Sequence, residues 1–433
     1  MIKIIKSSEF EKDGIVQKTV DSATITTAVA MVIANIIKRG DEALREYTER
    51  FDECILNSFE LPESTMDNAI DEVEPELIGV MERAAANIEE YHRKQINKGF
   101  DLPPKNGVIL GQKITPVGRV GVYVPGGSAS YPSSVLMNCI PAKIAGVNEI
   151  IIATPPSNNE NGASGMFNGV DARVIAAAKI AGADRIFTMG GAQAIAALAY
   201  GTETIPRVDK ITGPGNAYVT EAKRQVFGIV GIDMLAGPSD ILIIADSSAD
   251  PELIAADMLS QCEHGPDSIS ILITNNRGIA EKVSAEIESQ LMELPRKDIA
   301  RRAIDDQSMI IITKTIDEAF DLSNTIAPEH LEILLSEPFH YLEKVKNAGS
   351  VFLGMNTPET VSDYYAGPNH VLPTSGTSRF SSPLSVDDFV KKTSYTYYSQ
   401  EALKAASDDV IRFAEEEGLR AHALSIQKRV KKG

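Results

Sequence analysis

The pattern of apolar residues between Gly118 and Gly354 alternates between short strand-like runs and stretches of helical periodicity. Such alternation is typical of βαβ units built on parallel sheets, whose buried strands are apolar on both faces. The runs that qualify as strands are GVYV, EIIIAT, RIFTM, KITG, DILIIA, SISILIT, MIIIT, HLEILL and SVFLG. The chain is therefore predicted to be an α/β protein.

Nine strands exceed what one mononucleotide-binding half usually carries, so we expect two α/β lobes with a break near Pro238. Residues 23–52 read as an amphipathic helical region that precedes them. Residues 157–168 (SNNENGASGMFN) show no periodicity and are predicted to form a surface insertion without a chemical role.

The last fifty residues have a different character. They contain one polar strand-like stretch, KKTSYTYYS, and a long charged helix that begins at Gln400. This is too little apolar sequence to bury a core of its own. We expect the tail to pack on something else, such as a second subunit.

Composition limits the classes of function. The 433 residues include 60 acidic and 42 basic side chains, a net charge of -18, and 43% of them are apolar. A negative field of this size repels phosphates and anionic lipids, so neither nucleic acid nor a membrane surface is an expected partner. The three scattered cysteines and the absence of an apolar signal segment at the N-terminus favour the cytoplasm.

Candidate metal ligands begin with Gln261 and His264, three residues apart at the end of a predicted helix. Oxygen and imidazole donors with this spacing suit a divalent cation such as zinc. A histidine in this position more often caps a helix or fills a core. Asp363 and His370, in the Gly- and Pro-rich segment DYYAGPNHVLPT, are predicted to lie on a fixed loop that could complete the site.

Candidate acid and base groups are Glu329 and His330, at a predicted junction between helix and strand. Adjacent carboxyl and imidazole groups offer two proton carriers of different pKa, although a solvent-facing loop is also compatible with APEHL. Glu417 and His422 lie five residues apart, which places them on different faces of a regular helix. If both serve one site, the ligand must lie over a helix end or the local backbone must be irregular.

Three glycine-rich turns each follow a predicted strand and open a predicted helix: YVPGG, GGAQAIAALAYGT and GPGNAYV. Their backbone N–H groups could bind an anionic cofactor, and tight packing explains the glycines equally well. None of them has the GxGxxG fingerprint, and no P-loop is found.

These motifs occur together and in order: YVPGGSA, GGAQAIAALAYGT, GPGNAYVTEAKRQV, AGPSD, QCEH, APEHL, SDYYAGPNHVLPT and GLRAH. From about residue 20 to the C-terminus, the sequence resembles the histidinol dehydrogenase family. The resemblance implies oxidation of L-histidinol through L-histidinal to L-histidine, in histidine biosynthesis, with two NAD reduced and one Zn²⁺ per subunit. It also implies two incomplete Rossmann-like lobes and a homodimer with shared active sites, in which the C-terminal segment is exchanged.

Residue roles follow from the resemblance. It implies Glu329 and His330 as catalytic residues, Glu329 activating water. The implied zinc ligands are Gln261, His264, Asp363 and His422. The implied NAD contacts are Tyr123, Gln193 and Asn216. The implied substrate contacts are Ser239, Gln261, His264, His330, Asp363, His370, Glu417 and His422.

The implied domains are an N-terminal extension (1–19), a first lobe (20–122 and 241–384), a second lobe (123–240) and a C-terminal extension (385–433). Asp240 departs from the glutamate that is commoner in the family, which is expected to affect no site. A neutral imidazole at His330 would suit removal of the alcohol proton. Cys262 is better explained as buried filler than as a nucleophile.

Two alternatives remain open. A relative in the same superfamily could oxidise another small amino alcohol or diol, but His370, Glu417 and Ser239 suit an imidazole-bearing cation. A zinc hydrolase would also use an acid and imidazole pair, and it would not require NAD.

Overall fold

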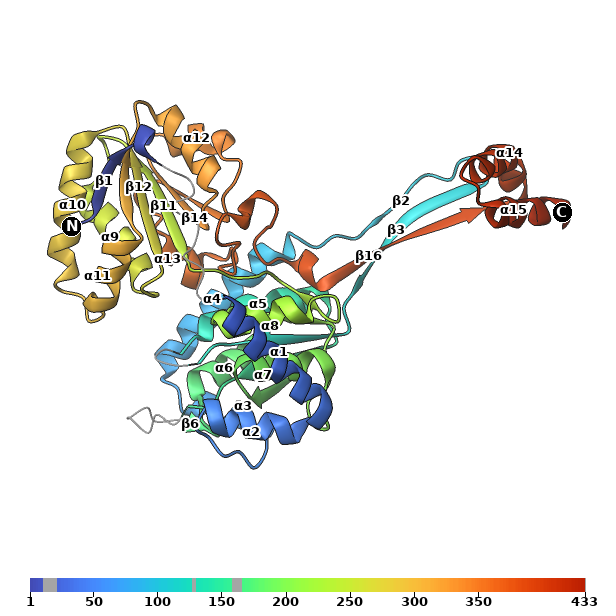
Figure 1. Cartoon of the computed structure of the whole chain (residues 1–433), viewed down its shortest axis with the longest axis horizontal. Helices are drawn as coiled ribbons and strands as arrows, with labels where there is room; N and C mark the ends of the chain where they lie inside the picture. The colour runs from blue at the N-terminus through green and yellow to red at the C-terminus, as the bar shows by residue number, and fades with distance from the viewer. Residues whose placement is uncertain (11–21, 127–129, 158–165, 433) are drawn as a thin grey trace. The chain divides into compact units, whose positions relative to one another are not determined.

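The structure is a computed structural model that describes residues 1–10, 22–126, 130–157 and 166–432. The chain divides into two compact units. Unit 1 comprises Met1–Gln95 and Gly118–Phe389, and unit 2 comprises Ile96–Val117 and Val390–Gly433. Each unit is described by itself, and Figure 1 gives the element labels.

The first lobe of unit 1 is a six-stranded parallel sheet in the order β1-β13-β12-β11-β14-β15. Its strands are β1 (Lys3–Lys6), β11 (Asp240–Ala245), β12 (Ile269–Thr274), β13 (Met309–Ile312), β14 (His330–Leu334) and β15 (Ser350–Leu353). Every residue of β11 is buried, because helices cover both faces of the sheet.

Alternate residues of β11 face different helices. Ile241 and Ile243 belong to the core formed with α9 (Pro251–Cys262), α10 (Arg277–Leu291) and α11 (Lys297–Asp306). Leu242 and Ile244 pack with α12 (Ile316–Ile326) on the other face. The period of two in side-chain direction thus distributes one apolar strand between two cores.

The second lobe of unit 1 is a five-stranded parallel sheet in the order β10-β9-β4-β5-β8. Its strands are β4 (Arg119–Tyr123), β5 (Glu149–Thr154), β8 (Arg185–Thr188), β9 (Lys210–Thr212) and β10 (Gly231–Ile232). One core joins this sheet to α1 (Ser22–Arg39), α2 (Asp41–Phe51), α7 (Gly191–Tyr200) and α8 (Ala217–Val226). Further helices of this lobe are α3 (Ser64–Asp71), α4 (Pro75–Arg93), α5 (Pro132–Ala145) and α6 (Ala172–Ala181).

The nine predicted strands are all confirmed, and the two sheets separate between β10 and β11, around Pro238. The lobe boundaries differ from those predicted. Residues 22–39 were assigned to the first lobe, yet the apolar face of α1 packs against α7 and α8 of the second. Residues 3–6, predicted as part of an extension, form β1 of the first sheet. The predicted helical region 23–52 is two helices, because Gly40 at φ +52° separates them.

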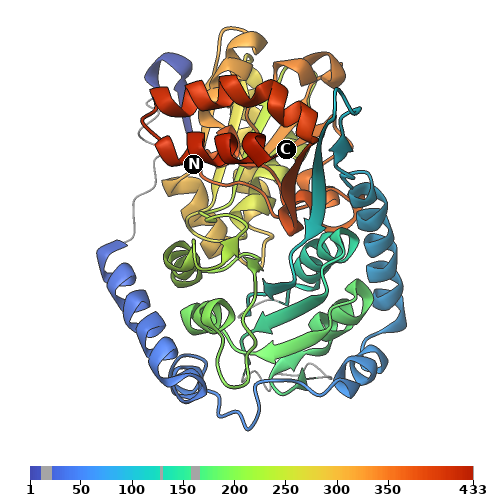
Figure 2. The ribbon, with the colours of Figure 1, turned by 90° about the vertical axis from the view of Figure 1, so that its right-hand side faces the viewer.

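Unit 2 contains an antiparallel sheet and two helices (Figure 2). The sheet has the order β16-β3-β2, from β2 (Phe100–Asp101), β3 (Val108–Pro116) and β16 (Val390–Tyr398). All but the first residue of β16 are exposed. The predicted single C-terminal helix is wrong: α14 (Gln400–Glu416) and α15 (Arg420–Lys432) are separated at Gly418, whose φ of +73° ends the first helix.

The predicted insertion 157–168 falls largely on residues 158–165, outside the described part of the chain. Next to it, β6 (Met166–Phe167) pairs with β7 (Val170–Asp171). Among the residues described, no helix is both long and apolar enough to span a bilayer.

Candidate active site

Glu329 and His330 are placed by the end of a helix and the start of a strand, as predicted. Helix α12 ends at Ile326, Ala327 adopts the left-handed conformation, and Pro328 cannot continue the helix. His330 opens β14, where it is in register with Ile241 and Ser350. Gly349 passes so close that a Cβ there would lie 2.5 Å from the Glu329 carbonyl oxygen. This backbone leaves little freedom at the pair.

The Glu329 carboxyl is buried and accepts two hydrogen bonds on Oε2. The donors are Ser239 Oγ at 2.6 Å and the Asp240 backbone N–H at 3.0 Å. Burial raises the pKa of Glu329 to about 7, against the opposing effect of the His330 charge. A carboxyl with a pKa near neutrality is suited to exchange protons at physiological pH.

His330 lies among carboxylates. Its Nδ1 donates to the Asp240 carbonyl oxygen at 2.9 Å, and its Nε2 lies 3.9 Å from Asp363 Oδ1. Burial acts to lower the pKa of His330, but Glu329, Glu359 and Asp363 outweigh it and raise that pKa to about 9. This differs from the neutral imidazole that the sequence predicts, because three acidic groups stabilise the proton. Among the described residues, Nε2 has no hydrogen-bond partner.

Gln261 has the features of a ligand-binding side chain. It is fully buried in the last turn of α9, and neither its amide oxygen nor its amide nitrogen has a hydrogen-bond partner within the described chain. Such an orphaned buried amide is costly unless something else satisfies it. His264 follows just beyond the helix end and is exposed, with its backbone N–H bonded to the Gln261 carbonyl.

Asp363 and His370 lie together. Asp363 is in a π-helical turn, Ser362–Ala366, where a loop was predicted, and π-turns are frequent at functional sites. His370 Nδ1 donates to the Asp363 carbonyl oxygen at 3.0 Å. Burial lowers the pKa of His370, Asp363 opposes this, and the charges of His330 and His264 add to the lowering. These side chains therefore share one electrostatic environment.

The predicted metal ligands are only partly brought together. A cluster of three His, Cys, Asp or Glu residues able to hold a metal ion is not found in the parts of the chain that the structure describes. Unit 1 cannot provide one from the predicted set, since Gln261 is an amide and His422 belongs to unit 2. Glu417 caps the end of α14 and His422 lies in the first turn of α15. A helix break at Gly418 therefore lies between the two residues.

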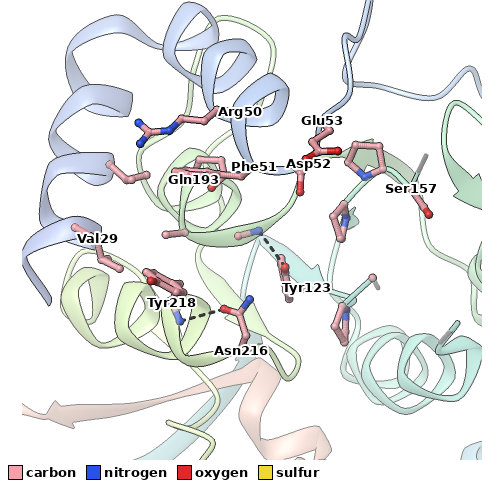
Figure 3. Close-up of a pocket in the computed structure, with 18 residues that line it drawn as sticks. Val29, Arg50, Phe51, Asp52, Glu53, Tyr123, Ser157, Gln193, Asn216 and Tyr218 are labelled. Carbon is pink, nitrogen blue, oxygen red and sulfur yellow. Dashed lines mark hydrogen bonds between the residues drawn. The ribbon is translucent and has the colours of Figure 1, made fainter. Parts of the chain in front are cut away.

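A pocket of about 870 Å³ lies in the second lobe (Figure 3). It is lined by all three predicted NAD contacts, Tyr123, Gln193 and Asn216. The Tyr123 hydroxyl accepts a hydrogen bond from the Gly191 N–H at 3.0 Å, and Asn216 caps α8 through the N–H groups of Tyr218 and Val219. The buried Gln193 amide nitrogen has no partner among the residues described.

The comparisons with known proteins agree with one another. The sequence model of histidinol dehydrogenase matches residues 16–430. The chain belongs to the histidinol dehydrogenase family. It is 51% identical to the histidinol dehydrogenase of Streptococcus mutans, covering 94% of this chain and 93% of that one. It is 49% identical to that of Heliobacterium mobile over the whole of both chains.

A crystal structure of histidinol dehydrogenase from Elizabethkingia anophelis superposes with a TM-score of 0.91 at 38% identity, covering 100% of this chain and 98% of that one. The predictions of the family, of an oxidoreductase and of a role in histidine biosynthesis are confirmed.

The sequence did not indicate a role for two residues near Glu329 and His330. Asp240, expected to affect no site, accepts a hydrogen bond from the Glu329 N–H at 2.8 Å and contacts His330 through its carbonyl. Glu359, at the start of α13 (Glu359–Val361), places Oε2 3.6 Å from His330 Nδ1. Burial raises the pKa of Glu359 to about 7. The only hint of this role in the sequence is that Glu359 is an acidic residue four positions before Asp363.

Cys262 is fully buried, and its thiol lies 3.3 Å from Ser270 Oγ. Burial raises the pKa of this thiol to about 11. A protonated buried thiol is a poor nucleophile. Cys262 is therefore better explained as a core residue, which is the role that the sequence favours.

Proposed function

We propose that this enzyme oxidises L-histidinol through L-histidinal to L-histidine, with NAD as oxidant and one divalent ion, zinc, per subunit. The observation that carries the proposal is the cluster of Ser239, Asp363 and the buried pair Glu329 and His330, together with membership of the family. A pocket of dinucleotide size lined by Tyr123, Gln193 and Asn216 supports it.

Zinc is proposed to be held by Gln261, His264 and Asp363, with His422 as the fourth ligand. The orphaned Gln261 amide and the acid and imidazole donors around it fit such an ion. When bound, zinc supplies a positive charge that fixes the amine and imidazole nitrogens of the substrate. Ser239, His370 and Glu417 complete the substrate site in this proposal.

In the first oxidation, His330 accepts the hydroxyl proton of the alcohol while hydride leaves the same carbon. Nε2 is the available atom, since Nδ1 is bonded to the Asp240 carbonyl. Asp363 is one of the three acids that raise the pKa of His330. A divalent ion held by Asp363 would offset its charge and bring the imidazole closer to the neutral base that the step needs. Bound NAD supplies the hydride acceptor.

In the second oxidation, Glu329 accepts a proton from the water that adds to the aldehyde. Its raised pKa makes it a stronger base than an ordinary carboxylate. Ser239 Oγ and the Asp240 N–H orient Oε2 for this role. Transfer of a second hydride from the hydrated aldehyde to a second NAD then gives the carboxylate.

The protein is also proposed to act as a homodimer in the cytoplasm, with His422 and Glu417 supplied to the partner's site. Unit 2 supports this, because its sheet strand β16 is exposed and its helices bury little apolar surface. All three cysteines are buried thiols, which suits a reducing compartment.

The direct test is an assay for NADH with L-histidinol and NAD. Zinc-replete protein should form NADH, chelation should abolish the activity, and added zinc should restore it. Activity that survives complete metal removal would contradict the metal requirement. A zinc-replete protein that forms no NADH would contradict the proposed function.

A further inference from the structure

Asp52 lines the pocket from the end of α2, and its position is fixed by the backbone. Its N–H donates to the Thr48 carbonyl at 3.0 Å and ends the helix. The side chain packs against the glycine turn that opens α7: Oδ1 lies 3.1 Å from where a Cβ on Gly190 would be. Figure 3 shows its carboxyl directed into the pocket.

One oxygen of this carboxyl is unsatisfied. Oδ2 is shielded from solvent and has no hydrogen-bond partner in the described part of the chain. Burial raises the pKa of Asp52 to about 6, so the group is mainly ionised at neutral pH. An ionised carboxyl with an oxygen that lacks a donor is costly, and a ligand that brings donors to the pocket-facing side of this carboxyl gains affinity.

The chemistry of the oxygen decides which part of a dinucleotide can meet it. A ribose diol offers two neutral hydroxyl donors, which a carboxylate accepts in a strong, charge-assisted hydrogen bond. A phosphate offers only negative charge, which the carboxylate repels in a partly buried site. An acidic residue at the adenosine ribose is the general means by which proteins select NAD over NADP.

The elements around the pocket indicate how a dinucleotide would be oriented in it. Figure 3 shows Asp52 on the upper side of the pocket, at the end of α2, and Asn216 on the lower side, at the start of α8. The helix that Asn216 caps is tied to the catalytic lobe, because Thr220 Oγ1 donates to the Ala236 carbonyl at 3.2 Å and the chain then reaches Ser239, which donates to Glu329. The nicotinamide therefore belongs at the Asn216 end and the adenosine at the Asp52 end.

We propose that Asp52 binds the diol of the adenosine ribose and makes the enzyme selective for NAD over NADP. This inference rests on the proposed function, since it assumes that the pocket holds the dinucleotide. Arg50 is the basic residue of the same rim, and its guanidinium lies over the Phe51 ring, 5.2 Å from the centroid.

The test compares kcat/KM for NAD and for NADP at saturating L-histidinol in wild-type protein and in Asp52→Asn. Wild type should prefer NAD by on the order of 100-fold. In D52N, kcat/KM for NAD should fall roughly tenfold through KM, and the preference for NAD should shrink by roughly tenfold or more because the repulsion of the 2′-phosphate is gone. Glu49→Gln removes an exposed acid from the same helix and should change neither ratio.

Calorimetric titration of NAD and NADP into the same proteins gives a readout that needs no turnover. If wild type binds both dinucleotides equally, Arg50 accepts the 2′-phosphate and the inference is wrong. An unchanged preference in D52N, or in Asp52→Ser should D52N misfold, would also overturn it. A wild-type protein that binds NAD selectively but forms no NADH from L-histidinol would contradict the proposed function and leave the role of Asp52 supported.

Discussion

At the scale of single residues, the main feature of the candidate active site is a group of buried acidic side chains. Glu329, Asp240 and Glu359 surround one imidazole, and burial raises the pKa of each acid to between about 6 and about 7. Perturbed acids gathered around a histidine are characteristic of proton-transfer sites. The sequence marked Glu329 and His330 by their adjacency, but Asp240 and Glu359 come from other elements and meet the imidazole only in the fold.

Replacement of Glu329 by glutamine should separate the two oxidations. Glu329→Gln cannot accept the proton of water, so turnover of L-histidinal should fall about 10²–10⁴-fold, the usual contribution of a general base. Oxidation of L-histidinol to the aldehyde should fall less. Steady-state rates with each substrate measure this, with Glu337→Gln, an exposed acid of the same lobe, as control. Equal losses in both steps would contradict the assignment of water activation to Glu329.

The charge of Asp52 should destabilise the fold of the protein without cofactor. Its pKa is about 6 in the fold and 3.8 ordinarily, so the penalty of its charge is absent below about pH 4, grows as pH rises, and is complete above about pH 6. Asp52→Asn should therefore melt at a higher temperature than wild type at pH 7 and at the same temperature at pH 4. Thermal denaturation across this range measures the difference. A variant less stable at pH 7 would show that Asp52 has satisfied partners.

At the scale of elements, parallel strands were the predictable part of the fold. Runs such as DILIIA and EIIIAT are apolar throughout and form β11 and β5 with the predicted bounds. Strand β1, KIIK, is short and has charged ends, so nothing in the sequence indicated that it would pair with β13. The lobe that α1 joins was not predictable either, since an amphipathic face specifies burial but not the sheet that buries it.

A buried ion pair stabilises the turn that contains Gly213, next to the pocket-lining Asn216. Lys223 and Asp233 form an ion pair with side chains only 3% and 1% exposed. Lys223 also donates to the Gly213 carbonyl, and Asp233 accepts the Gly213 N–H at 2.8 Å. Both polar groups of Gly213 are thereby held, three residues before Asn216. The pair fixes the turn from which α8 and its cap begin.

Lys223→Met should lower the free energy of unfolding by roughly 3–5 kcal/mol, because it leaves Asp233 charged and buried. The double variant Lys223→Met with Asp233→Asn should recover much of this loss, since no charge remains unpaired. Urea denaturation of the variants measures it. If the double variant is as unstable as the single one, the stranded charge is not the cause.

At the scale of the whole molecule, the proposed site draws its residues from both units of the chain. Glu417 and His422 lie in unit 2, and the other proposed ligands lie in unit 1. Sequence indicated a tail without a core, and β16 is indeed largely exposed. Spacing alone does not indicate whether the proposed fourth metal ligand, His422, acts in the site of its own chain or in that of a partner.

Mixed dimers test whether the sites are shared. His422→Ala and Glu329→Gln chains should each have little activity alone when L-histidinal is the assayed substrate. If each site combines His422 from one chain with Glu329 from the other, a mixed dimer contains one intact site, and co-refolded chains should recover up to about a quarter of wild-type activity. Activity that stays at the level of the single variants would indicate that each site is complete within one chain.

The proposed function requires that one site performs two successive oxidations of the same substrate. The most direct measurement is the amount of NADH formed when a limiting, known amount of L-histidinol is consumed by zinc-replete enzyme with excess NAD, with the product identified by mass spectrometry. The proposed function predicts two NADH and one L-histidine per L-histidinol. One NADH per L-histidinol, with the aldehyde as final product, would contradict it.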